Sequence, residues 1–229
     1  MSVIDWKDKE RAKEHLKRNG MLLHGAPDYV KDDAEMIFAA VYDCEEAVGF
    51  ASDRLMSDLS FLLDILHYGV RLPFSYKKSP LQDNEEAMGR LSEEYAPIIQ
   101  QASERLLNNE EYLKGLINNN LDVYLYVPEY INDKAFLIDL FKKEARLASV
   151  LPYGKYGDDK DIMLSCIHCY PYYYNYIDSS LKKDMDILSK LFRHQKAYRY
   201  LHPDDRIAIG LRFKMLPNDY WKVRNVKRR

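Results

Sequence analysis

The sequence predicts an all-α protein built as an α-solenoid, a stack of about eight helix-turn-helix repeats of roughly 25 residues. An Asp or Asn recurs at intervals of 24 to 26 residues, at Asp8, Asp33, Asp58, Asn84, Asn109, Asp133, Asp159 and Asp184. Apolar side chains follow each of these residues at the spacing of a helix face rather than of a strand. A short repeat cannot bury its apolar face alone, so we expect neighbouring repeats to stack around one continuous core.

The recurring Asp or Asn is predicted to cap the N-terminus of a helix. Its side-chain oxygen can accept a hydrogen bond from a free backbone N–H in the first turn. An acid often stands two positions later, where it suits the positive end of the helix dipole: Glu10, Glu35, Glu86, Glu111, Asp161 and Asp186. Pairs such as Asp159 and Asp161 resemble Asp-x-Asp metal motifs, but their register with the helix starts favours capping.

The first helix of each repeat is predicted from apolar residues three, four, seven and eight positions after the cap. In the third repeat these residues are Phe61, Leu62, Ile65 and Leu66. The first and fourth repeats keep the pattern more weakly, with His15 and Ser92 among the apolar positions. The pattern therefore predicts one amphipathic helix after each of the eight caps.

A second, shorter helix of about two turns is predicted from apolar residues 14, 15, 17 and 18 positions after the cap. In the seventh repeat these residues are Tyr173, Tyr174, Tyr176 and Ile177. An apolar residue near position 22, such as Leu55, is expected to hold the connecting loop against the core. Since no linker interrupts the register, we expect a single domain over 1–229, ending in a partial cap at 205–229.

The second repeat resembles a known family of short helical repeats. The segment from Asp33 to Val41, followed by Ala47–Ser52 and then Asp58, is similar to the pattern of the family named domain of unknown function 4116. The similarity covers about residues 31–58, and Ala102, Ser103 and Leu106 echo its second half. The resemblance implies α-helical repeats of the kind found in bacterial, viral or protist proteins. It implies no known activity and no catalytic residue.

Composition narrows the classes of function. A formal net charge of −2 argues against a general polyanion binder, although a basic tail ends the chain: Lys222, Arg224, Lys227, Arg228 and Arg229. No run of 18 apolar residues predicts a membrane span, and Met1–Trp6 lack the pattern of a secretory signal. Three cysteines without a disulfide framework favour a reducing compartment, so we expect a cytoplasmic protein, with signal-less secretion into a host cell left open.

One motif resembles a metal site. Cys166, His168 and Cys169 supply three of the ligand types that zinc uses. Cys166, however, stands seven positions after its cap, where other repeats carry Leu116 or Leu140, and we expect it in the core. The chain carries no phosphate-binding glycine loop, nucleophile elbow or spaced His pair. The sequence therefore predicts no metal, no cofactor and no catalytic residue.

Tyrosine is the compositional anomaly, with 19 residues concentrated late in the chain. Because Tyr combines a large apolar face with a polar tip, it is enriched at interfaces. We expect part of the set to be core and part to form a partner-binding strip within about 120–200; the candidates are Tyr124, Tyr126, Tyr153, Tyr156, Tyr170, Tyr172, Tyr174, Tyr198 and Tyr200.

The function predicted from these observations is a non-enzymatic protein-binding scaffold or inhibitor, one context being a microbial or phage protein that blocks a host factor. One alternative is a single-stranded nucleic-acid binder that uses the tyrosines and the basic tail. A second alternative is an enzyme whose site no motif reveals.

Overall fold

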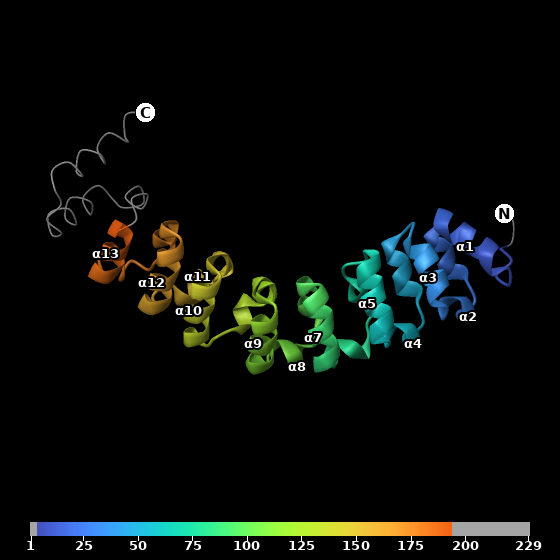
Figure 1. The fold of residues 1–229 in the computed structure, drawn as a ribbon, viewed down its shortest axis with the longest axis horizontal. Coiled ribbons are helices and arrows are strands. Elements are labelled where there is room, and N and C mark those ends of the chain that lie inside the picture. The colour runs from blue at the N-terminus through green and yellow to red at the C-terminus, as the bar shows by residue number, and fades with distance from the viewer. Residues whose placement is uncertain (1–3, 194–229) are drawn as a thin grey trace, which may run out of the picture. The chain divides into compact units, whose positions relative to one another are not determined.

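The computed structural model describes residues 4–193, and these residues are all-α: helices are their only regular elements (Figure 1). The predicted cap at 205–229, the basic tail, Tyr198 and Tyr200 lie outside the described residues. None of the described helices is both long and apolar enough to cross a lipid bilayer.

The chain forms two compact units, Met1–Tyr130 and Ile131–Arg229, which are described separately. The first unit contains α1 (Lys9–Arg18), η1 (Gly20–Gly25), α2 (Asp28–Lys31), α3 (Ala34–Val41), η2 (Glu45–Phe50), α4 (Asp53–Met56), α5 (Leu59–Tyr68), α6 (Pro73–Tyr76), η3 (Pro80–Asp83), α7 (Glu85–Glu94), η4 (Ala96–Gln101), α8 (Glu104–Leu107), α9 (Glu110–Asn119), η5 (Leu121–Tyr126) and η6 (Pro128–Tyr130), where η denotes a 3₁₀-helix. The second contains α10 (Lys134–Lys143), η7 (Ala145–Val150), α11 (Tyr153–Tyr156), α12 (Lys160–Cys169), η8 (Pro171–Tyr176) and α13 (Met185–Arg193). That all of 1–229 is one domain stays a prediction.

The longer helices pack side by side in chain order within each unit (Figure 1). In the first unit α1 contacts α3, α3 contacts α5, and the series continues through α7 to α9. In the second unit α12 lies between α10 and α13. Each helix therefore covers the apolar face of the next, and residues with the same repeat position follow one another along a unit.

All eight predicted helix caps are confirmed. Each of these helices begins immediately after its Asp or Asn, whose side chain accepts a hydrogen bond from a backbone N–H of the first turn. Asp159, for example, accepts from the N–H of Ile162 at 3.2 Å, and Asp184 accepts from that of Asp186 at 2.9 Å. The acid pairs Asp159/Asp161 and Asp184/Asp186 thus begin helices, as their register predicted.

The second half of the repeat differs from the prediction. Most of the second helices are 3₁₀-helices of six residues, and a third helix of one α-helical turn often follows where the sequence predicted a loop. Leu55 and Leu106 lie inside two of these short helices, α4 and α8, and both are buried. The loop prediction was wrong here because Ser52 and Ser103 cap the turn: each hydroxyl accepts the N–H three residues later.

The predicted core positions are largely buried. In α5 all four predicted residues from Phe61 to Leu66 are buried, and in α12 Cys166 is fully buried beside Ile167. Burial raises the pKa of the Cys166 thiol to about 12, so the thiol stays protonated at neutral pH. Cys166 is therefore a core residue, as its repeat position predicted.

Candidate partner-binding surface

Five tyrosines of the second unit gather where η8 meets α11. Tyr170 ends α12 in an extended conformation, and Pro171 at the first position of η8 starts the 3₁₀-helix immediately afterwards. This tight turn brings Tyr170, Tyr172, Tyr173 and Tyr176 together, and Tyr153 reaches them from α11. These five residues are called the tyrosine cluster below.

The rings of the tyrosine cluster form a supported layer. Tyr153 and Tyr176 are stacked, with ring centroids 4.6 Å apart and an interplanar angle of 18°. Tyr172 lies on Tyr173 at 4.2 Å, and Tyr170 meets the same ring edge-on at 5.8 Å. Tyr173 is only 1% exposed, whereas Tyr176 is 51% exposed and the other three are half-buried. Four partly accessible rings therefore rest on one buried ring.

The hydroxyl groups of the cluster have different surroundings. That of Tyr153 donates to the carbonyl oxygen of Ala148 at 2.9 Å. The Tyr173 hydroxyl is buried beside those of Tyr153 and Tyr172, but it makes no hydrogen bond of good geometry with any described residue. Burial raises the pKa of Tyr153 and of Tyr173 well above the usual range. Both groups therefore stay protonated at any physiological pH.

Three of the predicted surface tyrosines are core residues instead. Tyr124 is 0% exposed, and Tyr156 and Tyr174 are each 4% exposed. Tyr124 and Tyr174 stand 15 positions after their caps, where the second repeat buries Val48. The hydroxyls of Tyr156 and Tyr174 donate inward, to the carbonyl oxygens of Ile131 at 2.9 Å and Lys182 at 3.0 Å. Because backbone oxygens accept from the hydroxyls of Tyr156 and Tyr174, these two rings can fill core positions.

The remaining predicted residues divide between the units. Tyr153, Tyr170 and Tyr172 lie in the cluster, whereas Tyr126 is half-buried in η5 of the first unit. Tyr176 was predicted only as one of the apolar positions of the second helix, and it is the most exposed member of the cluster. Its position, 17 after the cap, is the last residue of the 3₁₀-helix, and Phe50 and Gln101 at the same position are also incompletely buried. This position in the repeat is the sequence feature that could have identified Tyr176 as a surface residue.

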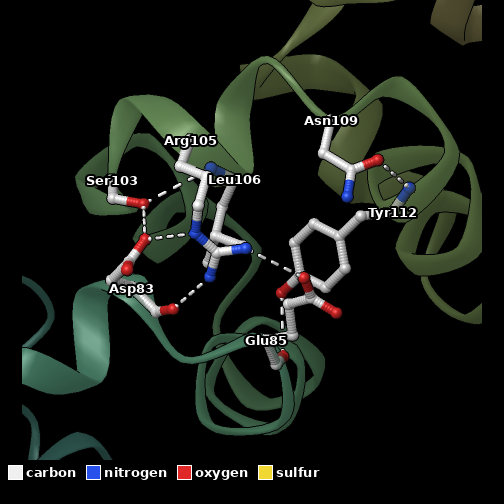
Figure 2. A network of polar contacts seen from close by, with 7 residues as sticks. All are labelled: Asp83, Glu85, Ser103, Arg105, Leu106, Asn109 and Tyr112. Carbon is white, nitrogen blue, oxygen red and sulfur yellow. Dashed lines mark hydrogen bonds and ion pairs between the residues drawn. The ribbon is translucent and has the colours of Figure 1, made fainter.

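A polar network in the first unit joins consecutive repeats (Figure 2). Asp83 accepts hydrogen bonds from the Ser103 hydroxyl and, at 2.9 Å, from Nε of Arg105. Arg105 also donates to the backbone oxygen of Asp83 at 2.5 Å and to Oε1 of Glu85 at 3.1 Å. Tyr112 donates to the Glu85 carbonyl oxygen at 2.9 Å. One carboxylate thus connects the end of η3 to the start of α8.

The same three residue types recur earlier in the chain. Asp32 accepts from the Ser52 hydroxyl and, at 2.9 Å, from Nε of Arg54, while the guanidinium also donates to the Asp32 backbone oxygen at 2.8 Å. We call each set, Asp32/Ser52/Arg54 and Asp83/Ser103/Arg105, a Ser-Asp-Arg clamp.

The geometry of the clamps fits a structural role. The Ser hydroxyl and then the Arg guanidinium lower the pKa of Asp32 and of Asp83, which makes each carboxylate a poor proton acceptor. Each Ser hydroxyl is also occupied as a helix cap. Recurrence at two repeat boundaries therefore favours joining of repeats over a Ser nucleophile. The sequence reasoning missed the clamps, although identical residues at identical spacing were visible.

The described residues contain no group of three His, Cys, Asp or Glu side chains that could hold a metal ion. Cys166 lies in the core, and the Cys169 thiol lies 3.5 Å from the backbone oxygen of Phe141. His168 is exposed on the outside of α12. The three residues of the zinc-like motif therefore do not converge on one site.

Residues 159–206 match the model of a family described as a domain of unknown function (DUF4116). The family resemblance is therefore confirmed over this partial segment, which includes α12 and η8, in addition to the similarity noted at residues 31–58. The matched segment carries Tyr170, Tyr172, Tyr173 and Tyr176 of the cluster. No curated protein and no solved structure matches the chain.

Proposed function

We propose that this chain is a non-enzymatic helical-repeat module that binds another protein through the tyrosine cluster. The observation that carries the proposal is the layer of four partly accessible rings on the buried ring of Tyr173. Rings that pack against each other are already ordered. The tyrosine side chains therefore lose little conformational entropy when a partner covers them. Tyr is also among the residues that contribute most to binding energy at interfaces.

The proposal includes a finer description of the fold. We propose that the eight capped repeats stack in series as one solenoid, which would present an extended surface to a partner. The eight caps in register and the side-by-side order of helices within each unit support this description. A module of this kind acts by occupying or bridging another protein, as an inhibitor or effector does.

The two alternatives lead to different outcomes of the same experiments. A single-stranded nucleic-acid binder would stack bases on the cluster and lose affinity steeply with salt, because phosphate contacts release counterions. An enzyme would turn over a substrate irrespective of the cluster.

The proposal is tested by affinity capture with the full chain, using lysate of its native cell or of that cell's host. Tyr172 and Tyr176 are changed to Ala together, because both are accessible and neither fills the core. Tyr174 is left intact because it is buried. We expect a specific protein captured by the wild type to be lost with the double variant.

The matched control is Tyr42→Ala, which removes a tyrosine that is 69% exposed and lies in the first unit. Capture should survive this change. A captured protein that the Tyr172/Tyr176 variant retains in full would refute the cluster as the contact surface. Capture of nucleic acid that disappears at high salt would favour the first alternative.

A further inference from the structure

We infer that the tyrosine cluster binds an uncharged, proline-rich segment of its partner in the extended polyproline conformation. This inference rests on the proposed function and adds the chemistry of the bound segment. Three properties of the cluster, as the described residues show them, support it: the arrangement of the rings, hydroxyl groups without a hydrogen bond and the lack of charged contacts.

The rings offer flat apolar faces at an accessible edge. The stacked pair of Tyr153 and Tyr176 is 4.6 Å from centroid to centroid, and Tyr176 is half exposed. Tyr172 meets Tyr176 nearly edge-on, with an interplanar angle of 77° and centroids 6.4 Å apart. Adjacent accessible aromatic rings are the kind of surface on which proline-rich segments dock in known polyproline-binding domains.

The hydroxyl groups of the cluster can donate hydrogen bonds to a bound segment. No hydrogen bond within the described residues involves the hydroxyl of Tyr170 or of Tyr176. A proline segment lacks backbone N–H groups but presents fully solvated carbonyl oxygens, which accept from such hydroxyls.

Within the described residues, the cluster has no charged contact to offer a charged ligand. No hydrogen bond or cation–π contact among them joins a cluster tyrosine to a Lys, Arg, Asp or Glu side chain. In the first unit, by contrast, the guanidinium of Arg71 lies 5.5 Å from the ring centroid of Tyr95. A phosphate-rich or strongly charged segment would therefore find no complementary charge at the ring faces.

The fold disfavours an extended peptide held by its backbone. The described residues contain no β-strand, so they offer no sheet edge to which a peptide could add. Side-chain hydroxyls and ring faces are the contacts available at the cluster. The polyproline conformation suits them because it needs no backbone ladder and is already extended in solution, which reduces the entropy lost on binding.

The test is a titration of the full chain with a fluorescein-labelled decaproline peptide, followed by anisotropy up to millimolar protein. A Gly-Ser peptide of equal length and an oligothymidine carry the same label. We expect decaproline to bind at least about tenfold more tightly than the Gly-Ser peptide. Tyr176→Ala should weaken the binding of decaproline by about tenfold or more. Tyr176→Phe should weaken it by about fivefold, because one hydrogen-bond donor is lost. Tyr42→Ala should weaken it by less than about twofold.

Each remaining outcome has a defined meaning. Decaproline that binds no better than the Gly-Ser peptide, or equally well to Tyr176→Ala, overturns the inference. Tighter and Tyr176-dependent binding of oligothymidine also overturns it and favours the nucleic-acid alternative. Protein capture that still depends on Tyr172 and Tyr176 would then leave the proposed function standing with a partner of different chemistry. Circular dichroism confirms that each variant is folded.

Discussion

Equivalent repeat boundaries in the two units are joined by different chemistry. In the first unit Asp32 and Asp83 each bind a Ser and an Arg of the next short helix. Counted from the next cap, the corresponding residues of the second unit are Asn132, Tyr153 and Lys155. Lys155 still donates to Asn132, but Tyr153 has replaced Ser and stacks on Tyr176 instead of binding the polar residue.

The difference shows how one repeat position can serve two purposes. A small hydroxyl at this position caps the short helix and binds a carboxylate of the preceding repeat, which uses its polar group internally. A tyrosine at the same position gives up that bond and builds an aromatic surface. The contact between repeats is maintained elsewhere, because Tyr156 donates to the Ile131 carbonyl oxygen, 25 residues earlier.

The largest effect is expected at the buried ring of the cluster. Tyr173→Ala should lower the free energy of unfolding by about 3–5 kcal/mol, because a large side chain is removed from a packed site. Tyr173→Phe should leave stability unchanged or slightly increased, because the buried hydroxyl makes no hydrogen bond of good geometry with a described residue. Urea unfolding followed by circular dichroism measures both.

Tyr156→Phe is the matched control for the Tyr173 pair, since that hydroxyl does donate to a backbone oxygen. It should cost about 1 kcal/mol. Equal costs for the two Phe variants would show that the Tyr173 hydroxyl has a partner after all.

A smaller effect is expected from opening a clamp. Ser103→Ala should lower the free energy of unfolding by about 1 kcal/mol, because α8 loses its cap and Asp83 loses a donor. Ser52→Ala should behave alike, since Ser52 makes the same two contacts. Thermal and urea unfolding of the single variants provide the measurement.

The control for the clamp is Ser57→Ala, which changes a serine at the repeat position of Asp32 and Asp83. Ser57 is exposed and belongs to neither clamp, so its loss should change stability by less than about 0.5 kcal/mol. Should Ser57→Ala cost as much as Ser103→Ala, the clamp would have no special role.

The smallest effect is the contribution of the first unit's clamps to the pH dependence of stability. The folded-state pKa of Asp32 and of Asp83 is lowered from the ordinary 3.8 by the Ser hydroxyl and then by the Arg guanidinium. A lowered pKa contributes stability that is present above the ordinary value and is lost as the pH falls through the folded-state value. Stability should therefore decrease below about pH 4, and less steeply in the Asp32→Asn/Asp83→Asn double variant.

Asn132→Asp is the control for this pH dependence. Asn132 stands at the position of the second unit that corresponds to Asp32 and Asp83, and its amide does not titrate. The substitution should therefore add to the acid sensitivity rather than reduce it. Melting temperatures between about pH 5 and about pH 2 measure both changes. Identical acid profiles for the wild type and the double Asn variant would exclude the clamps as its source.

Much of the fold was predictable from sequence because the deciding interactions are local. A cap acts on the N–H groups two or three residues later, and a helix face repeats every three to four residues. Hence all eight helix starts, and the core position of Cys166, follow from spacing. The third short helix was missed because it is only one turn long, too short for a periodicity to show.

The candidate site was only partly predictable. Composition pointed to the second half of the chain, and three of the candidates, Tyr153, Tyr170 and Tyr172, lie in the tyrosine cluster. Burial of Tyr156 and Tyr174 depends on carbonyl oxygens that only folding brings within reach of their hydroxyls. Tyr173 is buried although its hydroxyl has no such acceptor among the described residues, so the packing of one repeat on the next also decides which rings enter the core.

By itself, then, the sequence determined the all-α class, the helix starts and the period, because these depend on atoms a few residues apart. Tertiary structure decided which tyrosines face outward and that Asp32 and Asp83 each bind a Ser and an Arg more than one helix away. Contacts between groups 20 or more residues apart are set by how one repeat packs on the next. The tyrosine cluster and the clamps are two such contacts, built at the same position of the repeat.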